Sequence, residues 1–570
     1  MQKQKNKERG ITLVALVVTI IVLIILASAS IAMLVGENGI ITQAQRAAQE
    51  TEQAQKDEEA GLSSLETAIQ EALGNVYNEE KGVNAPKLAS GMTPIKFTNP
   101  TETEKGTVVE TTSDDVDWYD YEAKNWANAQ TEDGSMWVWI PRFAYRVNSS
   151  TQTFDVVFLV GTTDTYYDEN GELQTAKRCT REDELVDATT GFTVHPAFTD
   201  ETSINYRNGG WDKEITGIWV AKFEAGYASG NNDAEVVASN VNYTQEDAWV
   251  PDVESEETTT NNGIKKPARN WIDGQYGSTI TAIKYPVFQP VTYTMNYINH
   301  NDAYNIAKAL NSNENPYGFN GAADSHLMKN SEWGAVAYLS KSKYGLETID
   351  IAVNNINLNN STQSVYAITG CTSNNTTSVV ENTTIEKIMG SNGEGTTGNT
   401  ANEGIYTWDQ LNGTAASCTG TIYGIYDLSG GAWERTAGYV ANQNSNLSDY
   451  GRSIAYDGNN LKTISTKYTT VYPHNSTYDN TNMTDLNAAS SNNWEANTLI
   501  YGDAIRETST NGNENTSWYN DSSAFLGLNG PFSFRGGVYS NSRSAGLFSF
   551  GHDIGGNSYT NGFRAVVIVP

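Results

Sequence analysis

A run of 25 uncharged residues near the N-terminus constrains this chain more than any other feature of its sequence. It extends from Ile11 to Val35 and reads ITLVALVVTIIVLIILASASIAMLV. As an α-helix rising about 1.5 Å per residue it would be roughly 37 Å long, enough to cross a bilayer. Lysines and an arginine among the first nine residues precede it, and such residues stay on the cytoplasmic side. We therefore expect a single-pass membrane protein whose chain after Glu37 lies outside the cell.

A cleaved secretory signal peptide is the alternative interpretation of this segment. Its apolar part would be shorter and would end in small residues at a cleavage site. Ala27-Ser28-Ala29 has that character, so the alternative stays open.

The junction before the apolar run reads Glu8-Arg9-Gly10-Ile11-Thr12-Leu13-Val14 and resembles a type IV prepilin. That family is cleaved after the glycine. The resemblance implies that residues 1–10 are a leader, that Gly10 and Ile11 flank the cleavage site, and that prepilin peptidase and other pilins are partners. It also implies a bacterial cell-membrane location with association to a pilus.

The sequence departs from the pilin pattern at one position. The family usually carries Glu at the fifth mature residue, where it helps to register neighbouring subunits, and this chain has Ala15 there. The departure counts against a filament-building role. It leaves a minor pilin, a pseudopilin or a simple membrane anchor open.

The next segment has the pattern of a helical stalk followed by a linker. From Ile41 to Tyr77 the sequence is rich in Ala, Gln and Glu and contains no Pro, and apolar residues between Leu62 and Leu73 recur at helical spacing. We expect a stalk over residues 36–77. Residues 78–116 contain Gly, Pro and Thr punctuation, which predicts a linker into a head domain at residues 117–570.

Composition limits the classes of function. The chain has 570 residues and a formal net charge of −31, which argues against a nucleic-acid partner because phosphate binding needs clustered Lys and Arg. The hydrophobic content of 38 % includes 31 Tyr and 13 Trp, enough for a sizeable core. Three cysteines, Cys179, Cys371 and Cys418, match no close metal spacing. Cys371 and Cys418 could pair in an oxidising compartment, and free buried thiols are the alternative.

Several segments of the head have clear secondary-structure patterns. Residues 137–143 (WVWIPRF) and 218–224 (IWVAKFE) read as strands. Residues 301–310 and 330–339 read as helices with polar residues at their starts. Two stretches rich in Asn, Ser, Thr and Gly, residues 354–401 and 442–517, predict long surface loops inserted in one compact domain.

The C-terminal stretch from Arg535 to Arg564 alternates fixed-looking and adaptable segments. It opens with Arg-Gly-Gly, has Ala-Gly-Leu-Phe in the middle, and closes with Gly-Phe-Arg before an apolar tail. The gaps between these segments hold mostly Ser, Asn, Tyr, Gly, Thr, His and Asp. Tyr offers contact area at small entropic cost, while Ser, Asn and Gly offer hydrogen bonds and backbone freedom. A recognition surface fits this composition, and an ordinary polar loop between two strands is the alternative.

This frame, RGG…AGLF…GFR, resembles the C-terminal variable region of proteins diversified by diversity-generating retroelements. In that family the frame is fixed, and the gap residues are rewritten at adenines of a template copy. Asn codons mutated at their adenines cannot reach Lys, Glu, Gln, Met or Trp, and none of these five occurs from Gly536 to Pro570. The resemblance implies a variable protein or cell-surface ligand as partner.

The resemblance assigns roles to individual residues. The expected frame consists of Trp433, Arg535, Gly536, Gly537, Gly562, Phe563 and Arg564. The expected ligand-binding residues are Val538, Tyr539, Ser540, Asn541, Ser542, Arg543, Ser549, Gly551, His552, Asp553, Asn557, Ser558, Tyr559 and Thr560. Arg543, Tyr539, Tyr559 and His552 are the expected energetic anchors, because binding energy concentrates in Arg and aromatic residues.

The head as a whole resembles the formylglycine-generating-enzyme (sulfatase-modifying) branch of the C-type lectin fold. The matching pieces, in order, are VWIP, WVAKFE, the two helices, YGIYDLSGGAWE and RGG…GFR, spanning residues 117–570. The resemblance implies an α+β, C-type lectin-like domain with long insertions, preceded here by the pilin-like transmembrane helix. The resemblance leaves open whether the domain binds a structural calcium ion.

The chemistry of that enzyme family is not expected here. A formylglycine-generating oxidase needs reactive cysteines in its C-terminal part, and no Cys follows Cys418. The five histidines show no close paired spacing. We therefore expect no catalytic residues, no metal ligands and no required cofactor.

Taken together, these patterns predict a membrane-anchored, pilin-like surface protein that displays a diversified ligand-binding head. Two alternatives stay open: a minor pilin or pseudopilin with a structural role in a type IV pilus or secretion apparatus, and an enzyme of the formylglycine-generating type, which the missing cysteines disfavour.

Overall fold

The computed structural model describes most of the chain from residue 76 onward. The chain forms two units, residues 1–65 and residues 66–570, and residues 17–22 are the described part of the first unit. The described ranges are 17–22, 76–178, 191–200, 210–227, 282–290, 298–312, 315–354, 405–474, 501–510, 512–538, 544–556 and 560–569, with short pieces between them.

The predicted N-terminal transmembrane helix is the main correction to the expected fold. Residues 17–22 are helical. No helix among the described residues is long and apolar enough to cross a membrane. The fold prediction is therefore wrong in this respect, and the rest of the predicted span, residues 11–16 and 23–35, lies outside the described residues.

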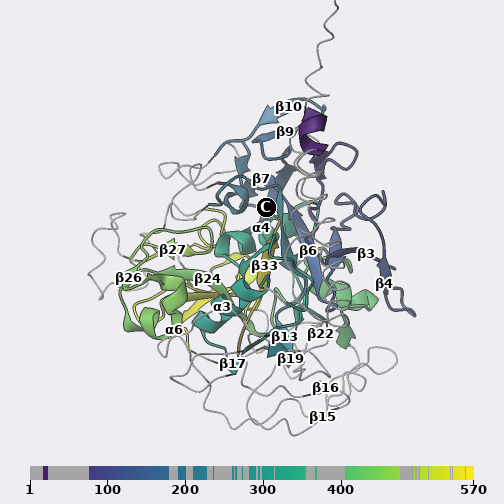
Figure 1. Ribbon diagram of the computed structural model, residues 1–570. Helices are drawn as coiled ribbons and strands as arrows, with labels where there is room; N and C mark the ends of the chain where they lie inside the picture. The colour runs from purple at the N-terminus through teal and green to yellow at the C-terminus, as the bar shows by residue number, and fades with distance from the viewer. Residues whose placement is uncertain are drawn as a thin grey trace, which may run out of the picture. The chain divides into compact units, whose positions relative to one another are not determined.

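The second unit is a sheet-rich α+β structure with few helices in its described part (Figure 1). One seven-stranded sheet has the order β20-β33-β12-β6-β5-β3-β4. Its strands are β20 (Asp324–Leu327), β33 (Ala565–Ile568), β12 (Gly217–Ala221), β6 (Met136–Pro141), β5 (Asn128–Gln130), β3 (Thr93–Phe97) and β4 (Val108–Glu110). The last strand of the chain therefore lies inside this sheet.

The central strands of this sheet are buried on both faces. β12 pairs with β6 through five residue pairs and with β33 on its other side. Every residue of β6 and β12 is buried, so neither strand has a solvent-facing side. Trp, Val and Ile dominate both strands, the residue types that pack best on a pleated surface.

A second seven-stranded sheet carries the predicted variable region. Its order is β27-β24-β30-β31-β29-β28, and β32 also pairs with β24. The strands are β27 (Thr470–Tyr472), β24 (Trp433–Val440), β30 (Phe532–Arg535), β31 (Phe550–Asp553), β29 (Ser523–Ala524), β28 (Asn513–Glu514) and β32 (Asn561–Phe563). The chain leaves this sheet after Phe563 and enters the first sheet at Ala565, so Arg564 stands at the junction of the two.

Two helices expected from the sequence are present nearly as predicted. α3 (His300–Ala309) begins after Asn299, whose side chain accepts a hydrogen bond from the Asp302 backbone N–H. α4 (Asn330–Ser340) is buried at every residue. Its Glu332 accepts a hydrogen bond from the Lys329 backbone N–H at 2.8 Å, which satisfies one of the free donors at a helix start. A third helix, α6 (Ser445–Ala455), packs against α3 (Figure 1).

Shorter elements complete the described structure. β7 (Phe143–Asn148) and β8 (Thr153–Phe158) form a hairpin that β11 (Thr193–Val194) extends. The remaining strands are β1 (Tyr77–Asn78), β2 (Val83–Asn84), β9 (Thr165–Tyr167), β10 (Leu173–Thr175), β13 (Gly226–Tyr227), β14 (Glu235–Val236), β15 (Thr260–Asn261), β16 (Ile264–Lys265), β17 (Ile272–Asp273), β18 (Ala282–Lys284), β19 (Tyr293–Thr294), β21 (Val353–Asn354), β22 (Tyr366–Ile368), β23 (Ile405–Thr407), β25 (Tyr456–Asp457) and β26 (Asn460–Leu461). The 3₁₀ helices are Pro196–Phe198, Leu411–Ala416 and Trp518–Asn520.

Two segments are more ordered than their composition predicts. The expected linker, residues 78–116, supplies β3 and β4 to the first sheet, and Tyr77 at the end of the expected stalk belongs to β1. The stalk residues 36–75 lie outside the described residues. The stretch 442–517, expected as surface loop, contains α6 and β27, and Leu447 and Ile454 of α6 are fully buried. The buried residues of α6, Leu447, Gly451, Ile454 and Ala455, have the three- and four-residue spacing of one helix face.

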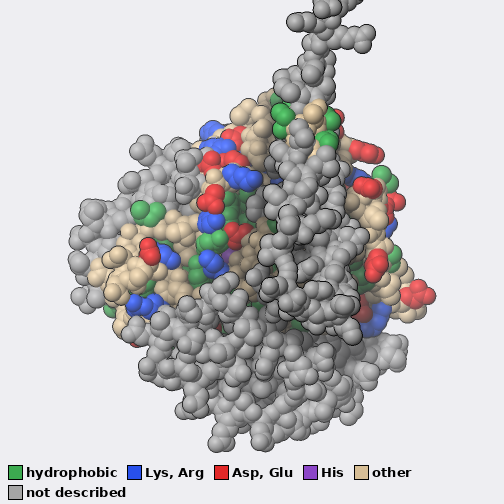
Figure 2. Space-filling model, viewed as in Figure 1, with side chains coloured by type: hydrophobic (Ala, Val, Ile, Leu, Met, Phe, Trp, Pro, Cys, Tyr) green, Lys and Arg blue, Asp and Glu red, His purple; other side chains and the backbone are tan. Residues whose placement is uncertain are grey.

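Charged side chains of both signs lie close together on the described part of the face in Figure 2. Surface pairs of this kind include Lys467 with Asp212 at 2.7 Å and Lys343 with Glu122 at 2.8 Å. Such exposed pairs contribute little to stability, so the core and the buried polar contacts hold the fold.

Candidate ligand-binding site

β24 lies between the two ends of the predicted variable region. On one side it pairs antiparallel with β30, where Glu434 faces Arg535. On the other it pairs parallel with β32, where Glu434 faces Gly562. The strand that enters the variable region and the strand that leaves it are therefore held by hydrogen bonds to the same strand, which fixes the distance between the two ends.

A buried ion pair closes the exit end. Arg564 donates two hydrogen bonds to the Glu434 carboxylate, at 2.9 Å and 2.5 Å, and both side chains are almost completely inaccessible. The same guanidinium donates to the backbone carbonyls of Ala221 in β12 and of Tyr426. Burial raises the pKa of Glu434, and the Arg564 charge opposes that shift. Arg564 thus ties the second sheet to the first.

A buried arginine also fixes the entry end. The Arg535 side chain is fully buried and donates hydrogen bonds to the carbonyls of Ser549, Asp503 and Ala504, at 2.7 to 3.1 Å. After it, Gly536 and Gly537 have φ angles of 85° and 78°, a region that favours glycine.

Buried hydrogen bonds also hold the middle of the variable region. The Trp333 indole N–H on α4 donates to the Leu547 carbonyl at 2.7 Å. The Phe548 backbone N–H donates to the Asp521 carboxylate at 2.9 Å. A Cβ atom on Gly546 would overlap that carboxylate, so the expected Ala-Gly-Leu-Phe segment is held as tightly as the two ends.

Arg435 holds the loop that follows β31. Its guanidinium, fully buried, forms an ion pair with Asp553 at 3.1 Å and donates a hydrogen bond to the Gly556 carbonyl. Asp553 also accepts from the Gly555 backbone N–H at 2.8 Å and from the Asn561 amide at 2.7 Å. This loop is therefore positioned by contacts at both of its ends.

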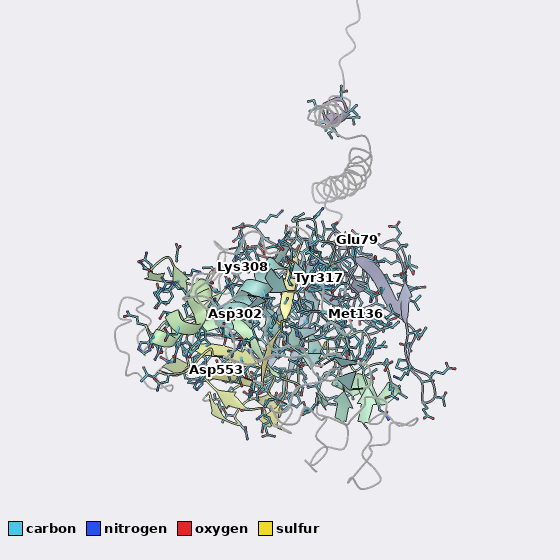
Figure 3. All side chains as sticks on the ribbon, turned by 60° about the horizontal axis from the view of Figure 1, so that its bottom comes forward. Glu79, Met136, Asp302, Lys308, Tyr317 and Asp553 are labelled. Carbon is cyan, nitrogen blue, oxygen red and sulfur yellow. The ribbon has the colours of Figure 1, made fainter. Side chains whose placement is uncertain are left out.

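A surface cavity of about 310 Å³ lies at this loop. Figure 3 places the labelled Asp553 beside the yellow C-terminal strands. Among the described lining residues, Trp433 at the start of β24 and Phe534 in β30 are aromatic, and their ring centroids are 4.3 Å apart. The other described lining residues belong to the variable region: Asp553, Ile554, Gly556, Ser558, Thr560 and Asn561.

The structure brings three of the predicted ligand-binding residues together in this cavity, namely Asp553, Ser558 and Thr560. Three others are buried instead: Val538, Ser549 and Gly551. Gly551 is packed so closely that a Cβ atom there would overlap the Phe534 ring. These three belong to the support of the site rather than to an exposed contact face.

Two further predicted residues are described outside the cavity lining. Asn541 is half-buried and closes a turn, since its side chain accepts a hydrogen bond from the Val538 backbone N–H at 2.8 Å. His552 follows Gly551 and precedes Asp553 on β31, so its side chain points to the other face of the strand, where it packs against Gly530. Burial lowers the pKa of His552.

The remaining predicted positions lie outside the described residues. They are Tyr539, Ser540, Ser542, Arg543, Asn557 and Tyr559 of the variable region, and Gly10 and Ile11 of the predicted cleavage site. Three of the four expected energetic anchors are among them.

Sequence reasoning missed part of the aromatic wall. Trp433 was expected as frame, and Phe534 was not singled out, yet both are half-buried and line the cavity. Ile554, 46 % exposed, and Asn561 were not named individually either. The sequence contained a pattern that could have indicated Phe534. Phe532 and Phe534 are two residues apart in β30, so their side chains lie on one face of the sheet, together with Gly551 and Asp553 of the paired strand β31.

The candidate reactive residues of the sequence are mostly core residues. His195, His300, His326 and His474 are buried. Cys418 is a free, buried thiol, and burial raises its pKa to about 12, while Cys179 and Cys371 lie outside the described residues. Among the described residues, no group of three or more His, Cys, Asp or Glu side chains is placed to hold a metal ion.

No protein-family model matches the chain, and no curated protein matches it. The resemblances to prepilins, to retroelement-diversified proteins and to the formylglycine-generating-enzyme branch therefore stay predictions that rest on the motifs quoted above.

Two buried acids beneath the entry end predict a pH dependence of stability. Burial raises the pKa of Asp503 to about 6, and burial with the Asp503 charge raises that of Glu507 to about 7. Unfolded carboxyls titrate near pH 4, so the folded state keeps protons that the unfolded chain has released. This stabilisation is fully present below about pH 4 and is lost as the pH rises through 6 to 7.

We expect the thermal midpoint to fall between pH 5 and pH 8, and Glu507→Gln, an isostere of the protonated acid, to reduce that fall. Differential scanning fluorimetry across this pH range measures the thermal midpoint of each protein. Exposed Glu102 supplies the control variant, Glu102→Gln, which should follow the original profile. Identical pH profiles for Glu507→Gln and the original protein would contradict the assignment.

The buried ion pair predicts strong coupling between its members. Arg564→Met leaves the Glu434 carboxylate buried without its cation, and breaking such a pair costs about 3–5 kcal/mol. The double variant Glu434→Leu, Arg564→Met removes both charges and should recover part of that loss. Urea unfolding of the single and double variants measures the coupling. Strictly additive effects would show that the pair does not hold the junction as described.

Proposed function

We propose that this protein is a ligand-binding protein whose contact surface is the cavity and the neighbouring gap residues of the variable region, and that a retroelement diversifies those gap residues. The observation that carries the proposal is the composition of the cavity. Of the eight described residues that line it, six come from the gaps of residues 535–564. The residues that do not come from the gaps, Trp433 and Phe534, belong to the strands that hold the region in place.

The buried residues that support this surface allow the gap residues to be substituted without loss of the fold. Arg535, Trp333 and Arg564 hold the entry, middle and exit of the region through buried hydrogen bonds. None of these three side chains lines the cavity. A site built on rigid elements keeps its geometry while its contact residues vary.

Binding fits the cavity better than catalysis. Among the described residues that line it, Asp553 is the titratable one, and its carboxylate already accepts hydrogen bonds from Arg435, Gly555 and Asn561. General acid–base chemistry needs a positioned group that is available to exchange a proton with the substrate. A carboxylate engaged in this way serves instead to order the loop.

The test is deep sequencing of the codons for residues 534–570, with the flanking DNA, in a growing population. We expect substitutions at gap positions such as Ile554, Ser558 and Thr560, matching adenines of a nearby template copy, and none at the codons of Arg535, Gly562 and Arg564. The codons for α4 provide an internal control for the background mutation rate. An invariant stretch without a template copy would contradict diversification.

A further inference from the structure

A short segment with two acidic residues holds the entry end of the variable region. It consists of residues 502–507, and we call it the acid segment. Arg535 donates hydrogen bonds to the backbone carbonyls of Asp503 and Ala504 in this segment, at 2.7 Å and 3.1 Å. The third acceptor of Arg535 lies outside it, and the second acid of the segment is Glu507. Movement of the acid segment therefore displaces two of the three groups that hold the Arg535 side chain.

The acid segment is closed by hydrogen bonds to its own carboxylates. The Gly502 backbone N–H donates to Glu507 Oε1 at 2.6 Å. The Ile505 backbone N–H donates to Asp503 Oδ1 at 3.1 Å. Ala504, which lies between these donors, has a φ angle of 53°, a left-handed conformation that is strained for a residue with a side chain. The closed form of the segment therefore persists only while these contacts hold it.

Several packed elements contribute titratable groups that face the two acids. These groups are Arg535 of β30, Tyr472 of β27, Tyr338 of α4, Tyr145 of β7, His195 before the 3₁₀ helix Pro196–Phe198, and Asp521, whose charge also acts on Arg535. Arg506 belongs to the segment itself, but its guanidinium lies over the Trp494 ring at 4.0 Å. Burial lowers the pKa of His195 to about 3, so its ring is uncharged. Among these described groups, Arg535 is therefore the cation that the two carboxylates share.

One arginine can compensate only one of the two carboxylates. Asp503 is the better placed, because the Tyr472 hydroxyl donates to its Oδ2 at 2.9 Å and the Arg535 charge favours its ionised form. The Oε2 atom of Glu507 is inaccessible to solvent and has no hydrogen bond among the described residues. A second buried charge without a cation and without donors is costly. The closed segment therefore keeps Glu507 protonated.

Opening of the acid segment leaves the exit end of the variable region in place. That end is held by Arg564 and Glu434, which bond each other, and by the bonds from Arg564 to the Ala221 and Tyr426 carbonyls. These contacts involve no residue of the acid segment. Local opening of a protein costs less free energy than unfolding of the whole chain, so the entry end can loosen by itself.

We propose that the acid segment is a pH-dependent switch of the variable region. Ionisation of Glu507 places a second negative charge beside Asp503, the segment opens, and Arg535 loses two of its three acceptors. The contact surface is then ordered in mildly acidic solution and loosened above neutral pH. This inference rests on the proposed function, because it describes a regulation of the same site.

The direction of the pH dependence follows from the two states of Glu507. In the closed segment, burial and the Asp503 charge raise its pKa to about 7, whereas a hydrated glutamate in an open segment titrates near pH 4. The open segment therefore binds fewer protons between these two pH values. Its population relative to the closed segment rises about tenfold per pH unit up to about pH 7 and is constant above it.

The experiment is amide hydrogen exchange of the full chain, read by mass spectrometry at pH 5, 6, 7 and 8 and corrected for the intrinsic pH dependence of exchange. Peptides covering residues 501–508 and 532–538 report on the acid segment and on the entry end. We expect their protection factors to fall about tenfold between pH 6 and pH 7 and to level off above pH 7. Peptides covering β6 and β12 should stay better protected at every pH, because they exchange only on wider unfolding.

Matched variants assign the pH dependence to the two acids. Glu507→Gln has the shape of the protonated acid and cannot ionise, so the fall between pH 6 and pH 7 should disappear. Asp503→Asn removes the neighbouring charge and should move the fall to lower pH. Glu102→Gln, at an exposed position, should reproduce the original profile. The thermal midpoint of each variant at pH 5 shows whether it is folded, and the pH profile of the original protein tests the inference without any variant.

Protection factors of the entry end that do not change between pH 6 and pH 7 would overturn the inference. The same fall in Glu507→Gln as in the original protein would also overturn it. Equal protection of the entry end and of β6 and β12 at every pH would show that the entry end opens only when the whole chain unfolds, which contradicts a local switch. Failure of the proposed function is a separate result, because invariant gap codons remove diversification and leave these exchange profiles as they are.

Discussion

The buried ion pair between Arg564 and Glu434 is the contact on which the rest of the site depends. It lies where the chain passes from one seven-stranded sheet to the other, between β32 and β33. Arg564 also donates to the Ala221 carbonyl in β12 of the first sheet. Two charges without solvent are favourable only when their hydrogen bonds are complete, and here the guanidinium and the carboxylate satisfy each other. The exit of the variable region is therefore fixed to the core of the molecule.

Three consecutive residues of β24 have different roles in the site. Glu434 points to the junction and holds Arg564, whereas its neighbours Trp433 and Arg435 serve the variable region directly. Trp433 gives the cavity a ring, and Arg435 positions the Asp553–Gly556 loop from behind. Because β24 also pairs with β30 and β32, the same strand holds the frame and places Trp433 in the lining of the cavity. Glu434 therefore serves stability, whereas Trp433 belongs to the contact surface.

The cavity was harder to predict from the sequence than the buried arginines beside it. The resemblance carried by RGG…GFR assigned Arg535 and Arg564 to the frame, and the side chains of both are fully buried. The two helices were predictable from their starting residues. The aromatic wall was not, because Trp433 and Phe534 are about 100 residues apart and meet only through the pairing of β24 with β30. α6 was missed because polar residues surround its few apolar ones. The apolar run at residues 11–35 predicted a membrane helix from hydropathy alone, and no described helix has the length to be one.

A scan of all substitutions at residues 535–564, scored for folding by protease resistance of the displayed chain, tests which residues stabilise this region. We expect the buried anchors, and not the cavity lining, to carry its stability. Most substitutions at Ile554, Ser558 and Thr560 should leave protease resistance unchanged, because Ile554 is exposed and the two hydroxyls bond each other and Asn561 rather than the buried arginines. Most substitutions at Arg535, Gly562 and Arg564 should abolish it. Equal sensitivity of the two sets would contradict the separation of frame from contact surface.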